Sequence, residues 1–262
     1  MSGLSATIEG IGFWANGLPS WQAARDYVAS QTLPSNPPSK PAPQLLAPNE
    51  RRRAPDSVAV ALEVALAACN DAGRDPKALP SVFASMHGDL AITDYMCAAL
   101  AQEPRALSPT RFHNSVHNAA AGYWTIGNGC VQATTAISAY DASFAQGLLE
   151  ALLQLATGSE AVLLAGYDAP SAGPLAKVST SRGLLGGALV LSGAAHGTRL
   201  RATLVDDGTR APLGALGALG ALCADNAMAP MLSLFDALAS GDDVALLTAG
   251  SGRMLRVEIA HA

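Results

Sequence analysis

The chain has 262 residues and a formal net charge of −5; 50% of its residues are hydrophobic and only 14% are charged. The acidic balance argues against a nucleic-acid binder, which would present a basic face. No apolar stretch is long enough to span a bilayer and no secretory leader is recognisable, so we expect a cytoplasmic protein. A mean hydropathy of +0.24 indicates deep burial of much of the chain, an apolar face covered by a partner, or both.

Four cysteines are scattered along the chain, with no Cys-x-x-Cys pair and no spacing typical of a metal site. In a chain without a signal peptide we expect them to be reduced and buried, as small hydrophobic side chains. None stands in a Gly- or Ser-rich turn before a helix, where a nucleophile would be expected. They are Cys69, Cys97, Cys130 and Cys223.

The N-terminal part of the sequence predicts apolar strands alternating with helices. Ser20 and Asp56 stand where helix N-caps are expected, and Gly73 is a typical helix end. Seven prolines between residues 31 and 55 exclude regular helix and predict an extended surface crossing. The expected elements are a strand at 6–15, a helix at 20–30, a helix at 56–73, a strand at 79–86 and a helix at 93–102.

Residues 108–151 form the stretch around which the chain is organised. They predict a loop rich in Asn and His, a helix of small residues, a tight turn and a β-prone run at 133–139. An abrupt bend at Tyr140 and Asp141 then leads into a helix at about 143–157. A strand that delivers one side chain to the start of a helix often builds a reactive site, because the positive end of the helix favours negative charge there.

The C-terminal part predicts strands at 161–166, 186–191 and 199–205, the last two joined as a hairpin by the turn at 194–197. The repetitive stretch from Pro212 matches neither helix nor strand periodicity and is interpreted as a connector. A helix at 227–240 and strands at 243–249 and 254–260 are expected to follow. This alternation predicts one α/β domain over residues 1–262, with a mixed sheet buried on both faces.

Three segments occur in an order and spacing that resemble the N-terminal half of the β-ketoacyl synthases of the thiolase-like superfamily. They are SPTRFHNSVHNAAAGYWTIGNG, GSEAVLLAGYDAP and SRGLLGGALVLSG. In the first, Asn118 and Gly122 match an Asn and a Gly that precede the strand carrying the catalytic Cys of that family. The resemblance covers about residues 6–205. It implies a layered α/β/α thiolase-like fold with a mainly parallel mixed sheet, truncated to a reduced C-terminal segment at 206–262.

Two departures from the family pattern bear on catalysis. Alignment without gaps places Tyr140, Asp141, Ala142 and Ser143 on the family's Ala-Cys-x-Ser, so Asp141 occupies the nucleophile position; a shift of one residue would put Tyr140 there. Neither replaces a thiolate, which transacylation from a pantetheine thioester requires. In addition, the sequence after Val205 lacks the family's His-Gly-Thr motif; His196-Gly197-Thr198 lies too early to be that motif, and only His261 follows.

A ketosynthase-like chain without the nucleophile resembles the chain-length factors. Among these, short forms with an FHNSVHN-like segment, as at residues 112–118 here, resemble the partner subunits of aryl-polyene and xanthomonadin-type pigment biosynthesis. This resemblance implies a non-catalytic subunit that forms a heterodimer with an active β-ketoacyl synthase. It implies no cofactor of its own, because acyl groups would arrive on the phosphopantetheine of an acyl carrier protein. The strand before the bend would pair with the partner; it comprises Ala133, Thr134, Thr135, Ala136, Ile137, Ser138 and Ala139.

The same resemblance suggests residues that line the acyl tunnel or the degenerate site. They are His113, Asn114, His117, Asn118, Trp124, Tyr140 and Asp141. The four-residue spacing of His113 and His117 would allow metal binding on a helix, but there is no glutamate between them and no third ligand nearby, so no metal is expected. Two other roles are favoured over metal binding and stay open: hydrogen bonding with Asn114 and Asn118 across the interface or around the tunnel, and hydrogen bonding within a local loop.

Several alternatives stay open. Asp141 with His113 or His117 could form an independent acyl-thioester or ester hydrolase, although a helix start lowers the pKa of a carboxylate and weakens it as a base. Asp141 could instead cap the following helix, and the protein could be a purely structural scaffold. The basic run Arg51, Arg52 and Arg53 could dock an acidic carrier protein, or could be a solvated turn with intramolecular pairs.

Overall fold

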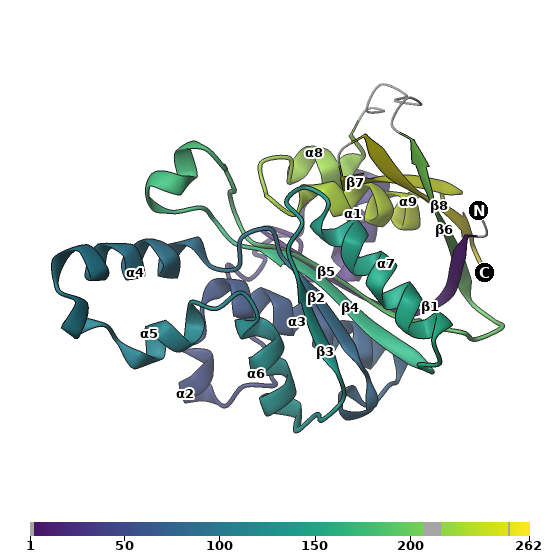
Figure 1. Ribbon diagram of the computed structural model, residues 1–262. Helices are drawn as coiled ribbons and strands as arrows, with labels where there is room; N and C mark the ends of the chain where they lie inside the picture. The colour runs from purple at the N-terminus through teal and green to yellow at the C-terminus, as the bar shows by residue number, and fades with distance from the viewer. Residues whose placement is uncertain (1–2, 207–215, 251) are drawn as a thin grey trace.

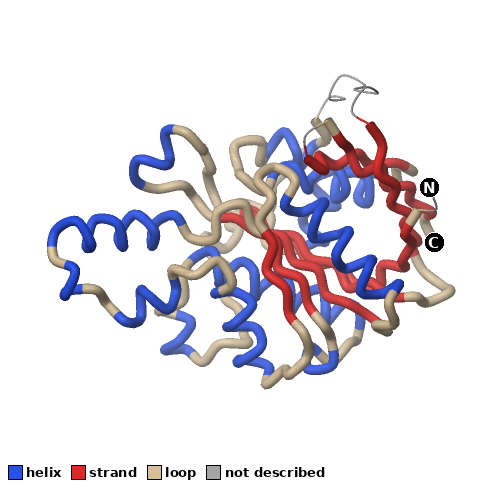
Figure 2. Tube along the Cα trace, viewed as in Figure 1, coloured by secondary structure: helices blue, strands red, loops and turns tan. Residues whose placement is uncertain are grey.

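The computed structural model describes residues 3–206, 216–250 and 252–262. Its described part contains one eight-stranded sheet in the order β3-β2-β4-β5-β1-β6-β8-β7, with helices on both faces (Figures 1 and 2). The α/β class with a mixed sheet is therefore confirmed. The strands are β1 Leu4–Ala15, β2 Ser81–Ala84, β3 Thr134–Ile137, β4 Ala161–Asp168, β5 Leu185–Ser192, β6 Thr198–Asp206, β7 Val244–Gly250 and β8 Arg253–Ala260.

Parallel pairing is less extensive than expected and is confined to one end of the sheet. β2 pairs in parallel with β3 and with β4, while the pairs that link β4, β5, β1, β6, β8 and β7 are antiparallel. β4 and β5 are buried along their whole length, which agrees with their continuous apolar sequences. β3 and β7 form the two edges.

The predicted hairpin of the strands at 186–191 and 199–205 is wrong. β1 lies between β5 and β6 and pairs antiparallel with both, so the chain passes from one side of β1 to the other through the turn at 194–197. The N-terminal strand thus fills a central place in the sheet. Its length of 12 residues lets it serve both neighbours, β5 mainly through its second half and β6 through its first.

The helices cover the sheet from two sides (Figure 1). α3 packs on β1, β4 and β5, while α7 packs on β2, β4 and β7, and α9 packs on β7. Phe13 and Trp14 are neighbours on β1 and enter two separate cores, because successive strand residues point to opposite faces. The helices are α1 Trp21–Ser30, α2 Pro48–Arg51, α3 Asp56–Ala72, α4 Leu90–Gln102, α5 Pro109–Asn114, α6 Ala119–Asn128, α7 Ser143–Ala156, α8 Ala218–Leu222 and α9 Leu232–Ser240.

Contact between α3 and β1 is close enough that backbone touches backbone. A Cβ atom at Gly12 would lie 2.0 Å from the Val64 carbonyl oxygen, and one at Gly10 would lie 2.3 Å from that of Ala68. Neither position therefore has room for a side chain. The two glycines allow α3 to lie directly on the strand, so the apolar helix is buried as its sequence predicts.

Several local expectations are corrected. The proline-rich crossing contains the short helix α2, which Pro48 begins at the first helical position, where its missing N–H costs nothing. α5 replaces part of the predicted loop, with Ser108 as its N-cap. Asp56 is the first residue of α3 rather than its cap. Residues 207–215 of the predicted connector lie outside the described residues, and α8 follows them.

The segment after β6 adds strands β7 and β8 to the same sheet and also forms the helices α8 and α9. Asp236 of α9 ties α8 in place, since its carboxylate accepts hydrogen bonds from the Leu219 and Gly220 N–H groups. Across the described ranges, no helix combines the length and apolarity needed to cross a membrane.

Candidate functional site

A strained elbow connects β3 to α7. The Ala142 N–H donates to the Ala139 carbonyl oxygen at 3.1 Å, and between them Tyr140 has a φ of +55°, in the left-handed region. A positive φ at the first central residue is the pattern of a type II′ turn, where glycine is usual, and a bulky residue there costs about 1–3 kcal/mol. The strand, bend and helix of a nucleophile elbow are thus present, and the strained residue is Tyr140.

The side chain of Ser143 holds this elbow in place from its buried side. Its buried hydroxyl accepts from the Ala139 N–H at 2.9 Å and donates to the Tyr140 carbonyl oxygen at 2.6 Å. The predicted capping role of Asp141 is therefore wrong. The N-cap of α7 is Ala142, without a side-chain hydrogen bond, and the exposed Asp141 carboxylate makes no hydrogen bond within the described ranges.

The predicted histidines and asparagines lie near the start of α6, mostly in local contacts. Asn114 is buried and accepts from the Tyr123 hydroxyl at 3.1 Å, while the exposed His113 packs edge-on against the Tyr123 ring. His117 Nε2 bonds to the Ser85 carbonyl oxygen at 2.9 Å. Asn118 is the exposed N-cap of α6 and makes no capping bond through its side chain. Neither histidine is hydrogen-bonded to Asp141 in the described part of the chain.

Trp124 belongs to the core. It is fully buried between α6 and β2, with its ring centroid 6.2 Å from that of Phe83. The indole N–H has no hydrogen-bond partner among the described residues. This burial agrees with the alternative that Trp124 is a core residue, and its place on the tunnel wall stays a prediction.

A buried carboxylate at the end of β4 is the main feature that the sequence reasoning missed. Asp168 has no exposed surface and accepts hydrogen bonds from Ser85 Oγ at 2.7 Å, the Met86 N–H at 2.9 Å and the His87 N–H at 3.2 Å. Burial raises its pKa to about 7, because loss of water outweighs the three hydrogen bonds that favour the charged form. An acid directly after the apolar run AVLLAGY was the available signal.

Asp168 anchors the hub loop, residues 85–89, and this loop holds the surrounding segments. The Ser138 hydroxyl donates to the Met86 carbonyl oxygen at 3.0 Å and fixes the end of β3. His87 Nε2 lies 2.9 Å from Ser179 Oγ on the loop after β4, and burial lowers the pKa of His87. With His117 bonded to Ser85, the hub loop joins β3, the α5–α6 junction and the loop after β4.

The two edges of the sheet differ in how their backbone is protected. On β7, the Ser233 hydroxyl donates to the Leu246 carbonyl oxygen at 2.6 Å and accepts from the Leu246 N–H at 3.1 Å, and Gln146 donates to the Ala249 carbonyl at 2.7 Å. On β3, residues 133 and 137 bond to β2, so Thr134 and Ala136 direct their backbone groups outward. No side chain of the described residues bonds to those groups. β7 is a blocked edge and β3 an open one.

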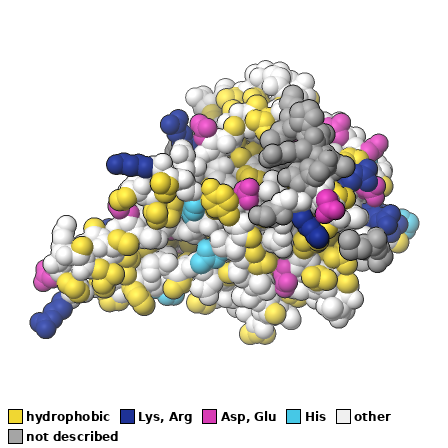
Figure 3. Space-filling view, turned by 45° about the horizontal axis from the view of Figure 1, so that its top comes forward, with side chains coloured by type: hydrophobic (Ala, Val, Ile, Leu, Met, Phe, Trp, Pro, Cys, Tyr) yellow, Lys and Arg dark blue, Asp and Glu magenta, His cyan; other side chains and the backbone are white. Residues whose placement is uncertain are grey.

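Exposed apolar side chains lie close to β3 in the sequence. Val131, just before the strand, is 95% exposed, and Ile126 on α6 is 77% exposed. Hydrophobic side chains also gather on the projecting part of the molecule that α4 and α5 form (Figure 3). Only Leu90 and Met96 of the apolar helix α4 are buried. This surface fits the expectation of an apolar face that a partner covers.

The comparison with protein families decides the class of the chain. Residues 21–213 match the family described as beta-ketoacyl synthase, N-terminal domain. The chain belongs to this family. The resemblance proposed from the three sequence segments is thereby confirmed. A search of curated proteins gives no match.

Solved structures with the same fold include ketosynthase complexes. A structure of the ketosynthase ApeO with its chain length factor ApeC from Xenorhabdus doucetiae matches with a TM-score of 0.76 and 22% identity, over 97% of this chain and 99% of that one. The AntDE:AntF complex, a type II acyl-carrier protein with its ketosynthase, matches with 0.74 and 13% identity over 100% of both chains. The ishigamide ketosynthase/chain length factor matches with 0.72 and 15% identity, over 98% and 99%. At these identities the likeness shows the shared fold.

In this chain of the β-ketoacyl synthase family, the basic run at residues 51–53 is partly engaged in contacts within the chain. Arg51 is half-buried and its guanidinium donates to the Leu46 carbonyl oxygen at 3.0 Å and to Gln44 at 3.3 Å. Arg52 is exposed and bonds to Asn49, and Arg53 is exposed. Two of the three arginines are thus exposed, and carrier-protein docking at this run stays a prediction.

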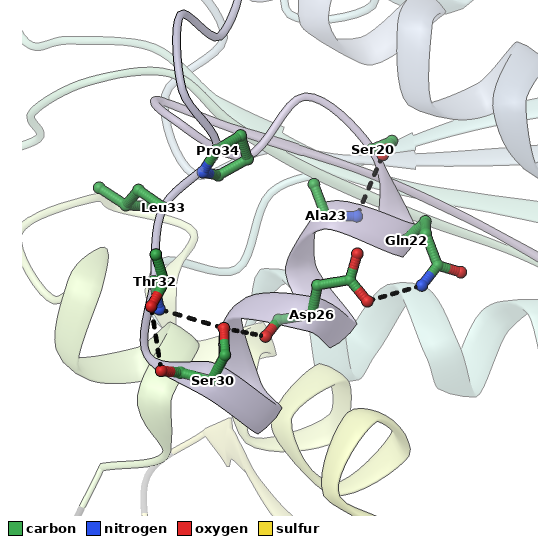
Figure 4. A pocket seen from close by; sticks show the side chains of 8 residues that line it. All are labelled: Ser20, Gln22, Ala23, Asp26, Ser30, Thr32, Leu33 and Pro34. Atoms are coloured by element: carbon green, nitrogen blue, oxygen red, sulfur yellow. Dashed lines mark hydrogen bonds between the residues drawn. The ribbon is translucent and has the colours of Figure 1, made fainter.

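Two surface hollows formed by the described residues lie away from the elbow. One of about 470 Å³ lies beside α1, and its polar groups bond to one another, as between Gln22 and Asp26 (Figure 4). Another of about 540 Å³ adjoins Arg74 and Glu160, which form an ion pair. Neither contains a predicted site residue. The first is lined by Ser20, Gln22, Ala23, Asp26, Ser30, Thr32, Leu33 and Pro34.

The cysteines are unpaired, and their burial varies. Cys69 and Cys130 are buried, Cys223 is partly buried, and Cys97 is exposed, against expectation, because α4 lacks cover. Burial raises the pKa of the Cys69 thiol to about 12 and that of Cys223 to about 11, which makes both unreactive at neutral pH. Within the described ranges, no three His, Cys, Asp or Glu side chains gather as a metal site would require.

Proposed function

We propose that this protein is a non-catalytic subunit of the chain-length-factor type, which forms a heterodimer with an active β-ketoacyl synthase. The observation that carries the proposal is the elbow, which keeps its strand, bend and helix but presents Tyr140 and Asp141. A phenol or a carboxylate cannot take an acyl group from a thioester as a thiolate does. The elbow therefore keeps the geometry of a nucleophile site but holds no residue that could carry out the acyl transfer.

Its biological role would be the assembly of aryl-polyene or other fatty-acyl or polyketide chains in the cytoplasm. The acyl groups would arrive on the phosphopantetheine of an acyl carrier protein, so the subunit would need no cofactor of its own. The full-length match to chains from complexes of ketosynthases with a chain length factor or a carrier protein supports this proposal. The resemblance of the FHNSVHN segment to aryl-polyene partner subunits supports the narrower product class.

The open edge of β3 is the proposed contact with the synthase. Its outward backbone groups on Thr134 and Ala136 are free to form a ladder with a strand of the partner. The exposed Val131 next to the strand would add apolar area to the same contact. The blocked edge at β7 would stay outside the interface.

A proline on the open edge should prevent assembly. Ala136→Pro removes an outward N–H and leaves the bonds from β3 to β2 intact, so the subunit should fold and lose at least about tenfold in affinity for the synthase. Val244→Pro is the matched control, because the Val244 N–H also points outward, on the β7 edge. Co-purification and a measured Kd test both variants. Equal binding by the two variants would remove β3 from the interface.

The function itself is tested by reconstitution with the β-ketoacyl synthase of the same biosynthetic pathway and its carrier protein. We expect a stable heterodimer, and products that lose their defined chain length when the subunit is absent. A subunit that stays monomeric while the synthase works at full rate and length without it would refute the proposal. Purified alone, it should hydrolyse no acyl thioester; turnover that Asp141→Asn abolishes would favour the hydrolase instead.

A further inference from the structure

We propose that Tyr140 is the anchor of the partner interface: the elbow holds its ring out from the end of the open edge so that it enters the facing surface of the synthase. This inference rests on the proposed function, since the synthase supplies the facing surface. In this proposal the Tyr140 side chain, and not the strand ladder, is the main source of affinity. The strand would set direction and register, and the ring would supply much of the binding energy.

The backbone of Tyr140 is the first reason. Within the described residues, the only other non-glycine positions with a positive φ are Gln31, which ends α1, and Asn36. Asparagine tolerates this region and helix ends often adopt it, whereas a tyrosine at the first central position of a tight turn gains nothing locally. Glycine would satisfy the turn without strain. Strain at an over-determined position is typical of functional sites.

The elbow is also held rigidly. The two hydrogen bonds of Ser143 fix the backbone on both sides of the bend, and the bond from Ser138 to Met86 ties the preceding residues to the hub loop. A rigid presentation lowers the entropy that binding would otherwise cost. The bend is therefore pre-organised before any partner arrives.

The exposed ring is the third reason. Tyr140 is 63% exposed, so its side chain contributes little to the core of its own chain. Tyrosine combines a large apolar face with a hydrogen-bonding hydroxyl and is enriched among the residues that dominate interfaces. The matching surface would be an apolar pocket with a polar group at its base. Asp141, the next residue in the chain, is also exposed, and its carboxylate would favour a basic residue at the rim of that pocket.

The decisive variant is Tyr140→Gly, with Gln31→Gly as its matched control. Both changes relieve a positive φ at an exposed residue, so both should raise the Tm of the isolated chain, by about 2–4 °C for Tyr140→Gly. The gain for Gln31→Gly should be smaller, because its side-chain amide also donates to the Tyr27 and Val28 carbonyl oxygens. Only Tyr140→Gly should weaken the heterodimer, by about thirtyfold in Kd. A gain in stability together with a loss of affinity is a combination that a structural tyrosine would not produce.

Three results would overturn the inference. If Tyr140→Gly binds the synthase as tightly as the wild type does, the ring is not an anchor, although the proposed heterodimer stands. If Tyr140→Gly lowers the Tm, the ring supports its own fold instead; Tyr140→Asn, which tolerates the same backbone, repeats this test should the glycine variant not fold. If the wild type does not bind the synthase, the proposed function fails and this inference fails with it.

Discussion

Gly12→Ala is expected to lower the free energy of unfolding by about 3 kcal/mol. The added methyl would lie 2.0 Å from the Val64 carbonyl oxygen, which belongs to the backbone of α3 and cannot rotate away. The whole helix would have to move off β1, and the core between them would lose its packing. Urea unfolding followed by circular dichroism measures the effect.

The matched control for this variant is Gly122→Ala. Gly122 lies inside α6, and a Cβ there would have nothing within 4 Å. Alanine should therefore raise the free energy of unfolding by about 0.5–1 kcal/mol, because it restricts the unfolded chain and favours helix. Equal effects of the two substitutions would show that the distance between α3 and β1 is not fixed by the glycines.

Stability should also depend on pH through Asp168. Its pKa is about 7 in the folded chain and 3.8 as the ordinary value, so between these limits the folded state holds a proton that the unfolded state has released. The unfolded state binds fewer protons, and the free energy of unfolding falls as pH rises. The contribution is fully present below about pH 4 and is lost as pH passes 7, at a slope of about 1 kcal/mol per pH unit.

The difference between wild type and Asp168→Asn isolates this contribution. Burial also raises the pKa of Asp236 and lowers that of His87, so the wild-type profile alone mixes opposite slopes. Near Asp168 stand the titratable groups of Tyr167, His87 and Asp89, and all three remain in the variant. We expect the advantage of the wild type over the variant to shrink between pH 5 and pH 8. A constant difference would mean that Asp168 stays ionised throughout.

Prediction of the sheet succeeded for the strands, overestimated the parallel pairing and failed for one connection. Apolar runs identified β4 and β5 because strands buried on both faces have few polar residues. A short turn between β5 and β6 suggested a hairpin, but pairing depends on which strand fills the neighbouring place, and β1 comes from far earlier in the chain. The difference in pattern was visible, since β5 is uniformly apolar while β6 alternates, as expected for strands at different depths.

For the site, the sequence located the elbow but not its details. The order of strand, bend and helix followed from local composition, whereas the residue that carries the strain depends on backbone angles that no side-chain pattern encodes. For Trp124 the sequence left a tunnel wall and the core both open, because large aromatic residues serve equally in cores and sites, and the structure shows that it is buried. Asp168 was missed because its importance comes from Ser85, Met86 and His87, which lie about 80 residues away in the sequence and meet it only in the fold.

The contrast between the two sheet edges sets how many molecules can join. A sheet with two open edges can add a neighbour on each side and grow into a filament, as edge-to-edge aggregates do. Ser233 occupies both backbone groups of Leu246 and Gln146 occupies the Ala249 carbonyl, so no continuous ladder can form along β7, although the Val244 N–H still points outward. With one edge closed, the chain can pair edge to edge with only one other subunit. Pairing through β3 would then end at two subunits, and the stoichiometry of the assembly would be built into each monomer.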